Sequence, residues 1–518
     1  MRKRLFIMVA GAALAAALVG PIASAGASYG KIVLPRGRTG VKGLAQANPG
    51  ARPITTHPGY TPTGSPSAGP TIGSSWQGLN DPSVSPPDPN GAIGPNSYME
   101  IINLQVALYH RDGTLIKSAS LQTLTGHNQF SLSDPMALFD PPTDRFYYNV
   151  WDVGQSTMAW GFSKTDNPQQ IPGDFCNYTN SFGYTTSEFP DYPKLGQSRD
   201  FLMIGVNHYP SLSTLHADRS DLLWINKPTQ LGPVTTCPPA TTFKSGIFKD
   251  VRNDDGTQAW TPVPAIEVDH SKYGYVMTSS DIECPDICGT GNKITVHLLR
   301  PTPGNRKVPE FFTTGHSVTV PTFAPPATNG PQKGTSNTIS TLDGRLEHAV
   351  AAIDPAVGKI VVYTGHNVNS TANRSEFRWY EILPTPFGSP TLVQSGTIKD
   401  SSLYVLNGAI SSDRTCQKAG CAHGDSLVAG FTTTSSTTYP AVQMASKIGS
   451  GAMSAFVMVH AATTFDADFT CTPNCRWGDY GGATPDPAQS LTAAHGEVWL
   501  TQDATNGGNI SWNWEAKP

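Results

Sequence analysis

The chain has 518 residues, of which 14% are charged, and its formal net charge is −4. It contains 50 glycines and 44 prolines, which exclude a mainly helical protein and favour many short strands joined by turns. The weak negative charge gives no reason to expect nucleic acid or an anionic membrane surface as a partner.

Residues 1–25 have the pattern of a signal peptide. Residues 2–4 are basic, an apolar stretch covers 5–19, and small residues at 23–25 offer a cleavage site. A retained N-terminal anchor is the alternative, but the stretch is shorter than the roughly 20 apolar residues of a membrane span. We therefore expect a secreted, extracellular chain without a membrane span, and we expect it to be a monomer.

The eight cysteines predict disulfides, which are favoured in exported chains. Zinc ligation is the alternative, but the closely spaced pairs lie far apart in the sequence and none has the two-residue spacing of a zinc knuckle. The spacing favours three local pairs and one longer-range pair, namely Cys284–Cys288, Cys416–Cys421, Cys471–Cys475 and Cys176–Cys237.

Residues 26–75 and 76–518 differ in organisation. The first range is rich in Pro, Gly, Ser and Thr and predicts an extended arm. The second repeats a unit seven times: a short strand of small residues with an acidic turn, an alternating apolar strand, and a strand of aromatic or branched residues. The short strands of the seven units begin at Asp81, Asp134, Asp191, Val263, His348, Asn407 and Asp479.

Seven such units predict an all-β fold, a seven-bladed β-propeller of four-stranded antiparallel sheets. One unit cannot bury both faces of its sheet, whereas radial packing of seven units buries them and protects the edges. The last unit ends at Pro518 with no residues left for a fourth strand. We therefore expect an N-terminal strand, from 31–35 or from the segment around Trp76, to close the ring. A pair of β-sandwiches is the alternative fold.

Five segments carry a resemblance to a known set of proteins: 88–103, 191–196, 378–382, 437–440, and the segment RWGDYGGATPDP at 476–487. With these segments the chain resembles secreted bacterial seven-bladed β-propeller proteins. The resemblance implies an extracellular propeller similar in shape to sialidases. Members of this set mostly lack an assigned reaction, so the resemblance implies fold and location only.

In a propeller, the first strand of each blade lines a central channel, and by analogy of fold the loops that enter these strands share the ligand-binding face. The ends of the second strands, at Asp152, His208, Asp281, His366 and Asp503, are expected on the same face. An Asp or Asn at a strand start also commonly bonds to the backbone of its own turn, which is the structural alternative. The candidate ligand-binding residues are Asp81, Asp134, Asp191, Tyr192, Arg345, His348, Asn407, Trp477, Asp479 and Tyr480.

The main hypothesis is that this Asp- and His-lined mouth binds an extracellular ligand, either a carbohydrate or a cell-surface component. A glycoside hydrolase with two ring carboxylates is one alternative. Its sialidase version would use arginines such as Arg345, Arg378 and Arg476, but the Ser-x-Asp-x-Gly-x-x-Trp boxes of sialidases are absent. A protein-binding scaffold with a purely structural channel is the other alternative.

Two further features concern ions and modification. Carboxylates around an axis suit Ca²⁺, which is the ion that this ring could bind. No sequence motif predicts an organic cofactor. Asn177-Tyr178-Thr179 is an acceptor motif for N-glycosylation and indicates a surface segment.

Overall fold

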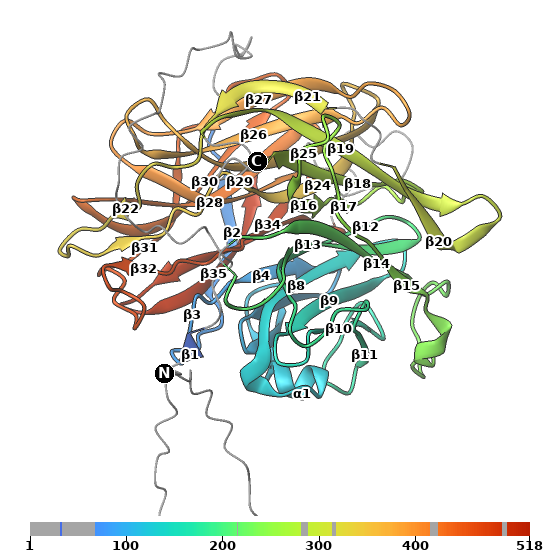
Figure 1. Ribbon diagram of the computed structural model, residues 1–518. Helices are drawn as coiled ribbons and strands as arrows, with labels where there is room; N and C mark the ends of the chain where they lie inside the picture. The colour runs from blue at the N-terminus through green and yellow to red at the C-terminus, as the bar shows by residue number, and fades with distance from the viewer. Residues whose placement is uncertain are drawn as a thin grey trace, which may run out of the picture.

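The computed structural model describes residues 32–33, 68–214, 216–280, 289–312, 317–414, 423–488 and 495–518 (Figure 1). Within these ranges the chain is nearly all β, with a single α-helix, α1 (Leu121–Thr125). No helix of the described ranges is long and apolar enough to cross a membrane. The predicted signal peptide, Asp281 and the predicted pairs Cys284–Cys288 and Cys416–Cys421 lie outside the described residues.

Sheets of four antiparallel strands follow one another along the chain. Sheet 1 contains β4 (Asn90–Ile93), β5 (Ser97–Ile102), β6 (Gln105–His110) and β7 (Leu115–Ser120). Sheet 2 contains β8 (Leu132–Asp140), β9 (Arg145–Asp152), β10 (Thr157–Ser163) and β11 (Phe175–Asn180). Sheet 3 contains β12 (Phe189–Gln197), β13 (Phe201–Tyr209), β14 (Arg219–Asn226) and β15 (Ser245–Phe248).

Sheets 4 to 6 continue the same order. Sheet 4 contains β16 (Ala259–Pro264), β18 (Gly274–Ser280), β19 (Gly291–Thr302) and β20 (Asn305–Phe312), and β21 (Ser317–Phe323) also pairs with β19. Sheet 5 contains β24 (Leu346–Asp354), β25 (Lys359–Asn369), β26 (Ser375–Leu383) and β27 (Thr391–Ile398). Sheet 6 contains β28 (Tyr404–Ser412), β29 (Ser426–Ser435), β30 (Thr438–Ile448) and β31 (Val457–Ala461).

Sheet 7 joins the two ends of the described chain. It contains β33 (Gly482–Pro485), β34 (Val498–Thr505), β35 (Asn509–Lys517) and the N-terminal β2 (Thr71–Gln77), with Trp76 opposite Asn513. The earlier segment β1 (Ile32–Val33) instead pairs in parallel with β3 (Val84–Ser85). In Figure 1 the blue β2 lies beside the red β34 and β35.

The innermost strands of consecutive sheets pack on one another in a complete circuit. In order, the contacting pairs are β4 with β8, β8 with β12, β12 with β16, β16 with β24, β24 with β28, β28 with β33, and β33 with β4. A short continuation of β16, β17 (Ile266–Glu267), also pairs in parallel with β12 and β24. The starts of seven distant segments therefore face a common centre.

Burial decreases from the centre outward. Every residue of the second strands β9 and β13 is buried, because neighbouring sheets cover both faces. The outermost strand β7 is exposed or half-buried along its whole length. Solid apolar runs near the centre and mixed sequences at the rim follow from this arrangement.

Two loops, one of them fastened by a disulfide, cover the end where the inner strands start. The loops contribute β22 (Gly330–Pro331), β23 (Thr338–Ile339) and β32 (Asn474–Cys475), which form one small sheet. The predicted disulfides Cys471–Cys475 and Cys176–Cys237 are confirmed. The first fastens the loop that carries β32.

Irregularities near the starts of the inner strands recur from sheet to sheet. The pairing register shifts around Asp134, Tyr192, Thr261 and Asn407, and each of these residues has a positive φ between 45° and 58°. Asp88, just before β4, has a φ of 49°. Such β-bulges redirect the local side chains, and here they do so at equivalent places in five units.

The pairing of β2 gives a prediction for stability. Trp76 packs on Tyr98, Tyr109 and Trp499, with ring centroids 5.4 to 5.9 Å away, so that it bridges sheets 1 and 7. We expect Trp76→Ala to lower the free energy of unfolding by about 2 kcal/mol, since the side chain is half-buried. Ile72→Ala, at an exposed position of the same strand, is the control. Equal denaturation midpoints for both variants would contradict the prediction.

Candidate functional site

Side chains from the four inner strands β8, β12, β24 and β28, and from the segments just before β4, β24 and β33, meet where the inner strands start. Nearly all are buried, and their ionisable groups lie close enough to influence one another's pKa. We call this set the central cluster. It consists of Asp88, Asp134, Tyr192, Lys194, Arg345, Glu347, His348, Asn407, Arg476, Asp479 and Tyr480.

Asp479 is the most highly connected member of the central cluster. Its backbone N–H donates to Asp88 Oδ1 at 2.6 Å, and its carboxylate accepts from Arg476 Nη2 at 2.5 Å. Its carbonyl oxygen accepts from the Tyr192 hydroxyl at 2.7 Å. Two segments far apart in the sequence, those of Asp88 and Tyr192, are therefore fixed to one residue.

The neighbouring residue Tyr480 extends the network to sheets 2 and 6. Its hydroxyl donates to Asp134 Oδ2 at 2.9 Å, and its carbonyl accepts from Asn407 Nδ2 at 3.1 Å. Its ring lies 5.0 Å from that of Tyr192.

Lys194 places an ammonium group in the middle of the central cluster. Its Nζ lies 3.7 Å from the ring centroid of Tyr480 and 4.0 Å from that of Tyr192, and donates to the carbonyl of Asp479 at 3.4 Å. Ring faces attract a cation but hydrate it poorly. Burial accordingly lowers the pKa of Lys194 to about 7.

The acidic members respond to burial in the opposite sense. Burial raises the pKa of Asp88, Asp134 and Asp479, and repulsion between these carboxylates adds to the effect for Asp88 and Asp479. Burial also raises the pKa of Glu347 to about 8. The centre therefore holds protons on carboxyl groups at a pH where exposed acids are ionised.

Arg345 is held in a fixed orientation. Its Nε donates to both carboxylate oxygens of Asp343 at 2.7 and 2.8 Å, and its guanidinium lies 4.3 Å from the ring centroid of Tyr192. His348 is fixed as well, because its Nδ1 donates to the carbonyl of Ile410 at 3.0 Å. Burial lowers the pKa of His348 to about 4, so the imidazole is neutral.

Four buried polar atoms of the central cluster have no hydrogen-bond partner among the described residues. They are Arg345 Nη1, Glu347 Oε2, His348 Nε2 and Arg476 Nη1. Buried polar atoms are normally paired, and leaving one unpaired costs about 1–3 kcal/mol. Two of the four are N–H donors, and the imidazole nitrogen is an acceptor. The set suits a ligand that both donates and accepts.

The structure brings together most of the residues that the sequence pointed to. Asp134, Tyr192, Arg345, His348, Asn407, Asp479 and Tyr480 all belong to the central cluster. Asp191 lies beside it and acts on the pKa of Tyr480. In sheet 3, however, the bulge position belongs to Tyr192 and not to Asp191.

Asp81 and Trp477 have other roles. Asp81 closes its own turn by accepting from the backbone and hydroxyl of Ser83, and the second Asp-Pro of the same segment, at Asp88, enters the cluster instead. Trp477 is buried against Ile339 and Leu406, and its Nε1 donates to Thr432 at 3.2 Å. It is a packing residue.

The residues expected at the ends of the second strands, and Arg378, make hydrogen bonds with groups near them. His366 bonds to Gly344 and Tyr380, and His208 lies between Glu188 and Asp218. Arg378 donates to the carbonyl groups of Pro321 and Thr322, away from the cluster. Asp503 accepts from Gly478, and Asp152 accepts from His127.

Residues missing from the expected site are Asp88, Lys194 and Glu347. Asp88 could have been found from the second Asp-Pro of its segment. Lys194 and Glu347 could have been found because each is a charged residue within a strand of small or apolar residues. A charged residue is rare in such a strand unless it is paired.

The central cluster does not have the geometry of a calcium site. Among the described residues, three ligand atoms lie within 4.8 Å of one another at Asp466, Cys471 and Cys475 and at Asp486, Glu497 and Glu515. In the first group the cysteines form a disulfide, so no thiolate is present. In the second, Arg111 pairs with Asp486 and Lys517 with the two glutamates.

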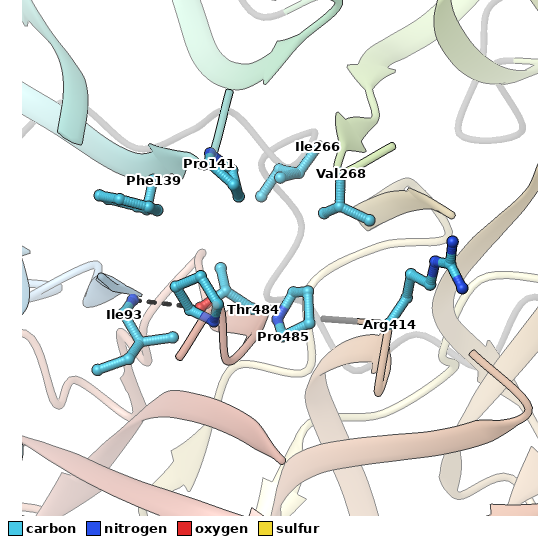
Figure 2. A pocket seen from close by; sticks show the side chains of 9 residues that line it. Ile93, Phe139, Pro141, Ile266, Val268, Arg414, Thr484 and Pro485 are labelled. Carbon is cyan, nitrogen blue, oxygen red and sulfur yellow. Dashed lines mark hydrogen bonds between the residues drawn. The ribbon is translucent and has the colours of Figure 1, made fainter. Parts of the chain in front are cut away.

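The opposite end of the inner strands holds a small cavity whose mainly apolar lining also includes Arg414 and Thr484. The cavity of about 20 Å³, room for about one water, lies among Ile93, Phe139, Ile266, Val268 and Pro485. Figure 2 shows these side chains around the cavity and the guanidinium of Arg414 directed away from it. The polar end is therefore the candidate site.

The raised pKa of Glu347 predicts a pH dependence. Between the ordinary pKa near 4.5 and about 8, the folded state binds more protons than the unfolded state, so Glu347 makes stability fall as pH rises. Glu347→Gln cannot ionise. We expect its melting temperature, relative to wild type, to increase from pH 5 to pH 8. Parallel melting profiles of the two proteins would show that Glu347 is not a buried acid.

No protein-family model and no curated protein matches the sequence. Among solved structures, a polysaccharide lyase described as an ulvanlyase is similar over 88% of this chain and 95% of its own, with 10% identity and a TM-score of 0.42. For Penicillium chrysogenum alpha-L-arabinanase these values are 74%, 93%, 10% and 0.33. Prolyl oligopeptidase B from Galerina marginata has 10% identity and a TM-score of 0.37 over 80% of this chain, which spans 46% of the oligopeptidase. All three scores lie below 0.5, and no conclusion about this chain is drawn from them.

Proposed function

We propose that the chain is an exported seven-bladed β-propeller that binds a carbohydrate at the central cluster. The circuit of contacts between inner strands and the place of β2 beside β35 support the propeller. The signal-like N-terminus and the two disulfides support export.

The observation that carries the binding proposal is the set of four unpaired polar atoms in the central cluster. Each sugar hydroxyl can donate one hydrogen bond and accept others. Donors at Arg345 Nη1 and Arg476 Nη1 and an acceptor at His348 Nε2 match such groups. A bound sugar would then satisfy atoms that the protein alone leaves unpaired.

The near-complete burial of the central cluster restricts the form of the ligand. Lys194 already occupies the faces of Tyr192 and Tyr480, so these rings are not platforms for a sugar. A single terminal or branch unit that enters end-on fits better than a polysaccharide that lies across the surface.

Hydrolysis of a glycosidic bond is the second candidate, favoured by one observation. Glu347, with a pKa of about 8, is a carboxyl group that holds its proton at neutral pH and has one unpaired oxygen. A general acid for a leaving group needs this property. Release of reducing ends from a bound oligosaccharide would convert the binding proposal into an enzymatic one.

Two substitutions of His348 separate ligand binding from folding. In His348→Asn the amide replaces the Nδ1 donor to Ile410 and removes the atom at Nε2, whereas His348→Gln keeps a polar atom near Nε2 and loses the Nδ1 donor. We expect His348→Asn to bind the strongest hit of a glycan array about fivefold more weakly in calorimetric titration, since one hydrogen bond is worth about 1 kcal/mol. His348→Gln should bind more tightly than His348→Asn.

Melting temperatures provide the control, because His348→Asn should melt close to wild type. Two results would refute the proposal: an array without a single hit, or equal affinity of wild type and His348→Asn. The first would favour a protein-binding scaffold with a structural channel.

A further inference from the structure

A second polar constellation lies on sheet 2, away from the central cluster. His127 follows the helix α1, Asp152 ends β9, and Thr179 lies on the outermost strand β11. His127 Nδ1 is 2.7 Å from Asp152 Oδ2, and His127 Nε2 is 2.8 Å from Thr179 Oγ1. Figure 1 shows α1 beside β11 at this edge.

The carboxylate fixes the direction of one of the two hydrogen bonds. A carboxylate only accepts, so Nδ1 carries the proton and donates to Asp152. The Thr179 hydroxyl can donate or accept, and it donates to the form of the ring in which Nε2 carries no proton. This order of hydroxyl, imidazole and carboxylate is the arrangement by which a base activates an alcohol nucleophile.

Asp152 is itself held in place. Its Oδ1 accepts from the backbone N–H groups of Gly154 and Gln155 at 3.0 and 3.2 Å. Burial acts to raise its pKa, but hydrogen bonds from His127 and Ser131 outweigh burial and lower the pKa below its usual value. The carboxylate is therefore ionised and oriented toward the imidazole.

The imidazole lines an open hollow. The hollow has a volume of about 500 Å³ and is bordered by His127, Asn128, Ser131, Asp152 and Gln155. This volume lies within the range of small-molecule sites. The His127 side chain is 15% exposed, and Thr179 is exposed. A small substrate can therefore reach the hydroxyl and the imidazole.

His208 has partners that differ from those of His127 and fit a purely structural role. His208 has a carboxylate at each nitrogen, Asp218 at 2.6 Å and Glu188 at 2.9 Å, so neither nitrogen faces an alcohol. His127 has a carboxylate at one nitrogen and an alcohol at the other. Only the second arrangement leaves a base next to a nucleophile.

The glycosylation motif does not account for Thr179. Asn177 donates to the carbonyl of Leu124 at 2.6 Å and accepts from the Tyr148 hydroxyl at 2.7 Å. Its amide is thus engaged within the fold, and the hydroxyl two residues later is turned toward His127 instead.

We propose that Thr179, His127 and Asp152 form an acyl-transfer site that hydrolyses small esters. Thr179 Oγ1 attacks the ester carbonyl while its proton passes to His127 Nε2, and that proton then leaves with the alcohol. Water, deprotonated by the same nitrogen, releases the acid and restores Thr179. Thr179 and His127 are catalytic residues, and Asp152 is a positioning residue that acts through His127.

The amide of Asn128 is one side-chain donor available to this chemistry. It borders the same hollow, and its Oδ1 accepts from the backbone of Phe130, which orients the amide group. A donor there would stabilise the negative oxygen of the tetrahedral intermediate, an effect worth about 100-fold in rate or more.

The test uses the full chain and p-nitrophenyl acetate. We expect wild type to release p-nitrophenol and to carry one acetyl group on the peptide that contains Thr179 after acid quench. Thr179→Ala and His127→Gln should each lose about 100-fold or more in kcat/KM, because they remove the nucleophile or the general base. Thr179→Ser should retain activity, since it keeps the hydroxyl. Asp152→Asn should lower kcat and leave KM unchanged.

Thr391→Ala is the matched control, because Thr391 is an exposed threonine on the outermost strand of another sheet. It should react like wild type. The proposal is overturned if wild type does not exceed the background rate, if Thr179→Ala keeps its rate, or if the acetyl group lies on another residue. Glycan binding by the His348 variants and ester hydrolysis by the Thr179 and His127 variants are separate measurements, so either proposal can fail alone.

Discussion

A left-handed residue near the start of several inner strands is the constraint on which the central cluster depends. In sheets 2, 3 and 6 this residue lies in a β-bulge, and the bulge directs Asp134, Tyr192 and Asn407 into the centre. Asp and Asn tolerate positive φ well, whereas Tyr192 does so at a cost of about 1–3 kcal/mol. The hydrogen bond from Tyr192 to Asp479 and its contacts with Lys194 and Arg345 offset this cost.

Charge at the centre is balanced by protonation as well as by pairing. Arg345 and Arg476 each have an aspartate partner, and Lys194 has only ring faces and a carbonyl. A fully ionised cluster would therefore leave carboxylates opposed in a nearly dry space. The raised pKa of Glu347 and the lowered pKa of Lys194 are the response to that environment. A site of this kind changes charge easily when a ligand replaces its solvent.

The sequence indicated repeated units because a small-residue strand, an alternating apolar strand and a strand of aromatic or branched residues recur in the same order. It also predicted most of the cluster, because a polar residue recurs at one place in each unit. The prediction was wrong for Asp81, because its segment contains two Asp-Pro pairs. Packing places the second pair, at Asp88, in the central cluster. His127 was missed because it belongs to a connection that has no counterpart in the other units.

The pairing of β2 with β35 has a consequence for how the molecule is made. Thr71 of β2 lies opposite Lys517 of β35. β2 is synthesised early, but it can pair only after β35 has been synthesised. Contacts of such long range are slow to form, because the whole intervening chain has to be ordered first. Until then Trp76 and the apolar face of sheet 1 on which it packs are open to solvent, and a chain without β35 leaves them exposed to association with other chains.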